Sequence, residues 1–102
     1  LLTMSKYILR DRKPVLMEDV LEWAKWFETA DRIVKKTTVG GARVSTVFLG
    51  DDYRFVGSPI LFESMVFGGP MDSEQRRYST WEEAEKGHEE LVVEVEAIAG
   101  NS

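Results

Sequence analysis

Three apolar segments between residues 43 and 88 constrain the fold of this chain more than any other feature. They read RVSTVFLG (43–50), PILFESMVFGGP (59–70) and RRYSTWEEAEKGH (76–88). The first two have the length and composition of β-strands, and the third passes from a short polar strand into a helix signal. Because the links between them are short, we expect antiparallel neighbours in one sheet that lead directly into a C-terminal helix.

Length and composition indicate one folded domain. The chain has 102 residues, too few for two independent cores, and its 43% hydrophobic and 30% charged residues are ordinary values for a globular protein. We therefore expect a single domain over residues 1–102, with disordered tails at 1–5 and 100–102. Met4 and the residues after it resemble an ordinary translation start, so residues 1–3 are given no role.

The chain has no cysteine, which excludes disulfide bridges, thiolate metal sites and cysteine nucleophiles. No apolar run approaches the roughly 18 residues of a membrane span, and the N-terminal residues lack the apolar core of a signal peptide. We therefore expect a cytoplasmic protein in a reducing compartment, without a membrane partner.

Charge is distributed unevenly along the chain. The formal net charge of −5 argues against broad non-specific nucleic-acid binding, which is driven by neutralisation of phosphates by cations. The N-terminal end is nevertheless basic, and the expected C-terminal helix is rich in glutamate. A solvated helix face is the ordinary explanation of such a run, and an electrostatic docking surface is the alternative. The basic residues are Lys6, Arg10, Arg12 and Lys13, and the acidic ones are Glu82, Glu83, Glu85, Glu89, Glu90, Glu94 and Glu96.

The N-terminal part predicts a small strand unit followed by a helix. Residues 6–17 fit a hairpin or a single edge strand with a polar break at 10–13. From Glu18 the apolar period becomes that of a helix, which we expect over residues 18–31. Trp26 falls outside its apolar stripe, where a half-exposed indole either covers a neighbouring loop or contacts a partner. The stripe consists of Val20, Trp23, Ala24, Phe27, Ala30 and Val34.

The larger sheet is expected to follow a polar connection at 35–41 that ends in two glycines. Strands are predicted at 43–49, 60–67 and 75–78. Residues 50–59 form either an aromatic loop or a bent extension of the first of these strands. Alternation along 60–67 places Leu61, Met65 and Phe67 on one face of the sheet.

The final helix has a clear start signal. Ser79 and Thr80 each have a glutamate three positions later, so either can form a capping box. Gly87 lies inside this helix, where glycine costs about 1 kcal/mol relative to alanine. A close approach by another backbone would explain its presence.

The expected fold is α+β, with a three- to four-stranded mainly antiparallel sheet, two helices packed on one face, and the element order β(β)αβββα. The other sheet face, with Leu61, Met65 and Phe67 or their opposite set, is then left uncovered unless a second subunit or the N-terminal segment closes over it, and an uncovered apolar face usually marks an interface. The candidates for a protein interface are Trp26, Tyr53, Phe55, Leu61, Met65 and Phe67.

His88 is the only histidine, and therefore the only side chain with an ordinary pKa near neutrality. On the apolar side of its helix it would pack and form a hydrogen bond to a backbone carbonyl or to Glu63. The alternative pairs it with Glu63, or with Asp51 and Asp52, as an acid–base couple or a metal site. Because one histidine with scattered carboxylates is a poor donor set, we expect no metal and no cofactor.

Other catalytic and phosphate-binding motifs are missing from the sequence. The serines lack the contexts of known nucleophiles, and the glycine pairs 40–41 and 68–69 lack the spacing and the lysine of a phosphate-binding loop. Arg76 and Arg77 can contact an anion or protect an edge strand, and the second role is the more usual one.

The segments RVSTVFLG, LFESMVFGG and RYSTWEEAEKGH give the chain a resemblance to a small protein that recurs in genomes of tailed bacteriophages and prophages. The resemblance extends from about Tyr7 to Leu91. It implies a phage or prophage origin and an accessory role, and it brings no activity, cofactor or catalytic residue with it.

We therefore expect a non-enzymatic phage or prophage accessory protein that binds a host or phage protein and forms a homodimer through the open sheet face or an edge strand. The alternative is a small enzyme or ligand-binding protein that uses Glu63, His88, Asp51 and Asp52. A weaker alternative is an acidic mimic of nucleic acid, in which the glutamate-rich helix occupies a basic site on another protein.

Overall fold

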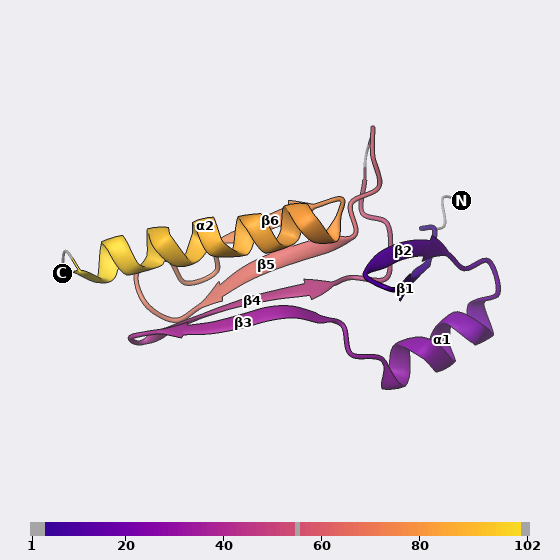
Figure 1. Cartoon of the computed structure of the whole chain (residues 1–102), viewed down its shortest axis with the longest axis horizontal. Coiled ribbons are helices and arrows are strands. Elements are labelled where there is room, and N and C mark those ends of the chain that lie inside the picture. The colour runs from indigo at the N-terminus through magenta and orange to yellow at the C-terminus, as the bar shows by residue number, and fades with distance from the viewer. Residues whose placement is uncertain (1–3, 55, 101–102) are drawn as a thin grey trace.

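The structure, a computed structural model, describes residues 4–54 and 56–100. It contains two antiparallel sheets and two helices in an elongated body of 49 × 29 × 22 Å (Figure 1). The expected α+β class and the antiparallel pairing are confirmed. In chain order the elements are β1 (Tyr7–Arg10), β2 (Lys13–Leu16), α1 (Val20–Thr29), β3 (Ile33–Val39), β4 (Ala42–Phe48), β5 (Phe62–Phe67), β6 (Gln75–Tyr78) and α2 (Trp81–Gly100).

The larger sheet is an antiparallel meander in the order β3-β4-β5-β6. Its register pairs Val44 with Val66 and Thr46 with Ser64, which brings the buried positions of β4 and β5 side by side. α2 lies along this face and contacts all four strands (Figure 1). The opposite side of the four strands, which we call the open sheet face, carries the alternate residues of each strand.

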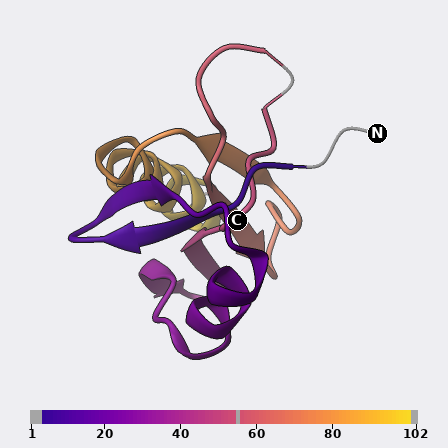
Figure 2. The same ribbon diagram turned by 90° about the vertical axis from the view of Figure 1, so that its right-hand side faces the viewer.

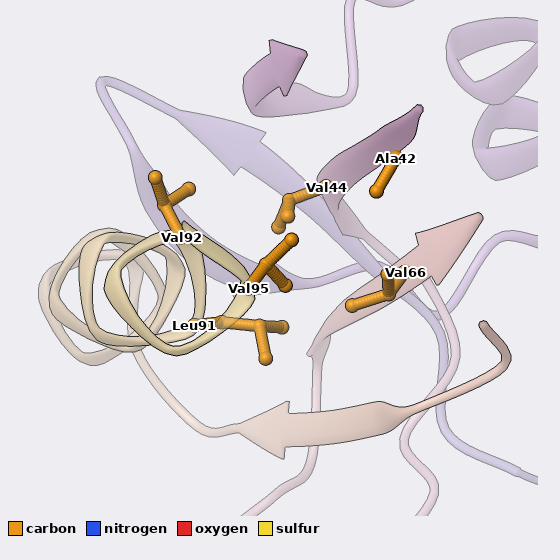
Figure 3. Close-up of a cluster of buried hydrophobic side chains, with 6 residues drawn as sticks. All are labelled: Ala42, Val44, Val66, Leu91, Val92 and Val95. Atoms are coloured by element: carbon orange, nitrogen blue, oxygen red, sulfur yellow. The ribbon is translucent and has the colours of Figure 1, made fainter. Parts of the chain in front are cut away.

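Two apolar clusters lie between α2 and the sheet. One joins aliphatic side chains of α2 to aliphatic side chains of β4 and β5 (Figure 3). The other is aromatic, and the ring centroids of Phe48 and Phe62 lie 5.3 Å apart in it. The first consists of Ala42, Val44, Val66, Leu91, Val92 and Val95, and the second of Phe48, Leu61, Phe62 and Ala84.

The predicted polar connection at 35–41 was wrong, because most of it belongs to the edge strand β3. Lys36 pairs with Ser45 and Thr38 with Arg43 across the β3–β4 ladder. An edge strand that faces solvent on one side lacks the apolar alternation of a central strand, and its threonines and valines favour extended backbone. The chain order is therefore ββαββββα, one strand more than the expected order β(β)αβββα with its optional strand counted, and the larger sheet has the four strands that the expected range allows.

The two helices do not lie side by side on the sheet, although Trp26 of α1 reaches the aromatic cluster on the same face that α2 covers. α1 lies beside β1 at one end of the molecule, away from α2 (Figures 1 and 2). Asp19 caps it by accepting hydrogen bonds from the backbone N–H groups of Leu21 and Glu22, and the chain turns extended at Ala30. The helix is thus shorter at both ends than the expected 18–31.

The final helix begins as the capping box predicts. The Glu83 backbone N–H donates to Thr80 Oγ1 over 3.1 Å, so Thr80 rather than Ser79 is the cap. Two residues of the expected tails have regular partners or structure. The Ser5 carbonyl accepts a hydrogen bond from the Asp52 backbone N–H, and α2 extends to Gly100. Residues 1–3 and 101–102 lie outside the described residues.

Candidate functional site

A row of polar side chains separates the two apolar clusters under α2. At its centre His88 is fully buried, with Nδ1 2.7 Å from Thr46 Oγ1 and Nε2 2.8 Å from Thr37 Oγ1. Thr46 Oγ1 also lies 2.5 Å from Ser64 Oγ, and the Tyr78 hydroxyl lies 3.1 Å from the same Ser64 oxygen. Burial lowers the pKa of His88, so the ring is neutral at pH 7.

His88 is therefore a packed residue with satisfied hydrogen bonds, but both partners expected for it were wrong. Threonine hydroxyls, rather than a backbone carbonyl or Glu63, accept or donate at its two nitrogens. Sequence alternation alone could have suggested this, because Thr46 and Ser64 occupy buried positions of their strands and need a polar neighbour.

Glu63 lies on the other side of the sheet from His88. Its cross-strand neighbours are Val47 and Arg77, and its Oε2 accepts a hydrogen bond from Arg77 Nε over 3.0 Å. The sheet itself separates the carboxylate from the imidazole, since Glu63 alternates with the buried Phe62 and Ser64. The acid–base couple proposed from the sequence therefore cannot form in this fold.

The two aspartates of the 51–54 segment have structural partners. Asp51 forms an ion pair with Lys6 over 2.6 Å. Asp52 is buried, accepts hydrogen bonds from the backbone N–H groups of Arg54 and Ile60, and pairs with the Arg54 side chain over 2.8 Å. Both carboxylates fasten the loop, and neither approaches His88 in the contacts that the structure shows.

Within residues 4–54 and 56–100, no three histidine, aspartate or glutamate side chains come together as a metal ion would require. Neither helix in that part of the chain has an apolar stretch long enough to cross a bilayer.

The interface candidates from the sequence separate into buried and exposed residues. Leu61 is 2% exposed, and Trp26 packs edge-on against Phe48 with ring centroids 5.8 Å apart, so both belong to the interior packing. Tyr53 and Phe67 are 43% and 42% exposed, and Met65 is half-buried on the open sheet face. Phe55 lies outside the described residues.

A groove at the start of α1 was missed by the sequence reasoning. It has a volume of about 470 Å³ and lies between the β1–β2 hairpin and the first residue of α1. Val20 in its lining is 57% exposed, and the residue that follows it, Leu21, is 74% exposed. The available signal was Leu21, an apolar residue that falls off the helical stripe. We call this region the N-terminal groove; its lining residues are Met4, Ser5, Lys6, Leu16, Met17, Glu18 and Val20.

The glutamate-rich face of α2 is partly neutralised within the molecule. Lys35 pairs with Glu89, and Arg76 Nη1 lies 2.6 Å from Glu94 Oε2. These hydrogen bonds lower the pKa of both glutamates, and the contact with Glu94 raises the pKa of Arg76. The remaining glutamates of α2 point to solvent, as an ordinary solvated face would.

No protein-family model, no curated protein and no solved structure matches this chain. Its function is therefore inferred from the residues and their geometry.

Proposed function

We propose that this is a phage or prophage accessory protein of the host cytoplasm that acts by binding proteins rather than by catalysis, and that it forms a homodimer through the N-terminal groove. The origin rests on the resemblance of residues 7–91 to the recurrent phage protein. The separation of Glu63 from His88 by the sheet speaks against the enzymatic alternative.

The observation that carries the proposal is the exposed apolar surface at the N-terminal groove. Val20 lines the groove together with Met4, Leu16 and Met17, and the next residue, Leu21, is 74% exposed. Contiguous apolar surface of this kind, rimmed by polar groups, is typical of an interface. It replaces the open sheet face as the proposed dimer surface, because Leu61 is buried and that face carries several charges.

A second copy of the chain is the occupant that we propose. A two-fold contact is self-complementary, so a surface with a projection beside a groove can supply both halves of it. Leu21 of one copy would enter the groove of the other, with its rim charges Lys6 and Glu18 of opposite sign. A partner protein would then meet a dimer rather than a monomer.

Sedimentation equilibrium over a micromolar concentration range tests the proposal. Wild type should sediment as a dimer, and Leu21→Glu should weaken association at least about tenfold, as removal of a central apolar contact does. Val93→Glu is the matched control, because Val93 is 64% exposed on α2 and the charge change is the same. Monomeric wild type at every concentration, or equal effects of the two substitutions, would show that the groove is not the dimer surface.

The acidic-mimic alternative predicts a different response of partner binding to substitutions and to salt. Its binding would depend on exposed α2 glutamates such as Glu82 and Glu90, and not on Leu21. Because exposed charges are screened by salt, such binding would also weaken steeply with ionic strength.

A further inference from the structure

The charges of this molecule are segregated between the two faces of the larger sheet. α2, which covers one face, carries seven glutamates and one lysine. The strand registers place three cationic side chains on the open sheet face, those of Lys36, Arg43 and Arg77. The same registers place one carboxylate there, that of Glu63. A net charge of −5 for the whole chain therefore coexists with one face on which cations outnumber carboxylates.

Two exposed aromatic rings on or beside this face each have a guanidinium group against them. The Arg43 guanidinium carbon lies 4.9 Å from the centroid of the Phe67 ring, and that of Arg77 lies 5.1 Å from the Tyr53 ring. Planar aromatic rings and guanidinium groups are the surfaces on which unpaired bases stack, and the same arginines can neutralise phosphates.

The two arginines lie at different points along β5. Arg43 is in register with Phe67, and Arg77 with Glu63, four residues earlier on β5. At the rise of an antiparallel strand this register separation is about 13 Å, so the two arginines with their rings can contact different nucleotides of one strand. Between them run Ser45, Met65 and Gln75, which offer hydrogen-bonding groups and a half-buried apolar side chain.

We infer that the open sheet face binds single-stranded nucleic acid, with Phe67 and Tyr53 as stacking rings and Arg43, Arg77 and Lys36 as contacts for phosphates. A duplex is a poorer occupant, because its bases are already stacked and three cations neutralise little of its charge. The glutamates of α2 point away from this face and repel a polyanion that approaches from the other side. This inference does not depend on the dimer, since the N-terminal groove is a different surface.

Fluorescence anisotropy of a labelled oligothymidylate, titrated with the full chain at low salt, tests this assignment. Phe67→Ala should weaken binding at least about fivefold, the lower range for removal of a base-stacking ring, and Phe67→Leu should weaken it comparably although it preserves apolar bulk. Arg43→Gln should reduce the dependence of log affinity on log salt by about 0.7, the value for one lost phosphate contact.

Two matched pairs of variants distinguish the effect of a charge on the open sheet face from the effect of the net charge of the chain. Lys86→Gln changes the charge as Arg43→Gln does, but on α2, and it should leave affinity and salt dependence unchanged. Glu63→Gln removes the carboxylate that pairs with Arg77 and should strengthen binding, whereas Glu90→Gln on α2 should not. Circular dichroism checks that each variant is folded.

Three outcomes overturn the assignment. The first is no anisotropy change up to the highest soluble protein concentration. The second is equal binding of a duplex of the same sequence, which would reduce the interaction to phosphate attraction. The third is equally tight binding of poly-L-glutamate with the same dependence on Phe67 and Arg43, which would make the face a site for acidic proteins. Loss of dimerisation in Leu21→Glu with unchanged oligonucleotide binding is the expected independence of the two surfaces.

Discussion

The two helices of this protein are held in opposite ways. α2 contacts four strands and buries Ala84, Leu91 and Val95 completely or nearly so. α1 has no buried residue and packs through the half-buried rings of Trp23 and Phe27, among others. Since most helical stability in proteins comes from tertiary packing, α2 belongs to the stable part of the fold and α1 to the part that opens first.

The N-terminal unit of β1, β2 and α1 is attached to the larger sheet at a few points. The Tyr7 backbone N–H donates to the Gly50 carbonyl over 2.7 Å, and within the unit the Trp23 indole N–H donates to the Tyr7 carbonyl over 3.0 Å. Gly50 has a φ of +82°, and a Cβ there would lie 2.8 Å from the Phe27 ring. The junction depends on a residue without a side chain, and the unit beyond it leaves Leu16, Val20 and Leu21 exposed.

The sharpest test of this contrast compares one leucine from each helix. Leu91→Ala removes a fully buried side chain from the aliphatic cluster and should lower the free energy of unfolding by about 3 kcal/mol, within the usual range for such cavities. Leu21→Ala removes a mostly exposed side chain and should change it by less than about 0.5 kcal/mol. Urea unfolding measures both.

Amide hydrogen exchange extends that comparison to the backbone. The amides of α1 should exchange through local opening in wild type, while those in the middle of α2 should exchange only through global unfolding. Equal protection of the two helices would contradict the division of the molecule into a stable and a loosely held part.

A smaller effect is expected from filling the one glycine in the middle of α2. A Cβ at Gly87 would lie 2.2 Å from Cε1 of Tyr78, so the Tyr78 ring would have to move and lose its hydrogen bond to Ser64. We expect Gly87→Ala to destabilise by about 2 kcal/mol, because the clash outweighs the gain in helix propensity of about 1 kcal/mol.

Thermal unfolding of Gly87→Ala and of Lys86→Ala gives the measurement and its control. Lys86 is the exposed neighbour of Gly87, so its replacement should leave the melting temperature nearly unchanged. Adding Tyr78→Ala to Gly87→Ala should recover part of the loss through a non-additive term. A stabilised Gly87→Ala protein would mean that Tyr78 does not pack against the helix as described.

Gly87 also shows how far the sequence could predict the fold. The glycine predicted a close approach, but only the structure shows that the approaching group is the Tyr78 ring rather than a backbone. The central strands and α2 could be predicted because their apolar periods reflect burial on a sheet. β3 could not, because an edge strand whose Lys36 and Thr38 face solvent has no such period.

For the candidate sites, the sequence could predict only which residues of one strand share a face of the sheet. Alternation placed Met65 and Phe67 together on one face without deciding that this is the open sheet face, and Leu61 precedes β5 and turns into the aromatic cluster. The pairing of Glu63 with His88 failed because residue type alone does not tell which side of a sheet a side chain occupies. The N-terminal groove depends on long-range packing of the N-terminal unit, and its one local signal is Leu21, an apolar residue off the helical stripe.

The smallest expected effect concerns the pH dependence of the stable part. In the unfolded chain His88 has its ordinary pKa of about 6.5, and burial lowers that pKa in the folded protein. The unfolded state therefore takes up protons first, and the free energy of unfolding should decrease as pH falls through about 6.5 towards the lower folded pKa. The charges nearest the ring, Glu89 and Lys35, act on it in opposite directions.

Urea unfolding at about pH 7 and pH 5 isolates this contribution, since the lowered pKa values of Glu89 and Glu94 take effect only at more acidic pH. His88→Gln should remove the decrease between the two pH values while the α1 amides keep the same exchange behaviour. A wild-type protein with unchanged stability over this interval would show that the imidazole is not held neutral in the core.

The polar row under α2 also has a direction. The Tyr78 hydroxyl donates to Ser64; if Ser64 in turn donates to Thr46 and Thr46 to His88 Nδ1, then His88 Nε2–H donates to Thr37. This order requires one tautomer of the ring, with its proton on Nε2. A second proton on Nδ1 would reverse the donors one after another as far as Tyr78, which lies against Gly87. The protonation of one buried ring would thereby be transmitted across the sheet to the edge strand β6.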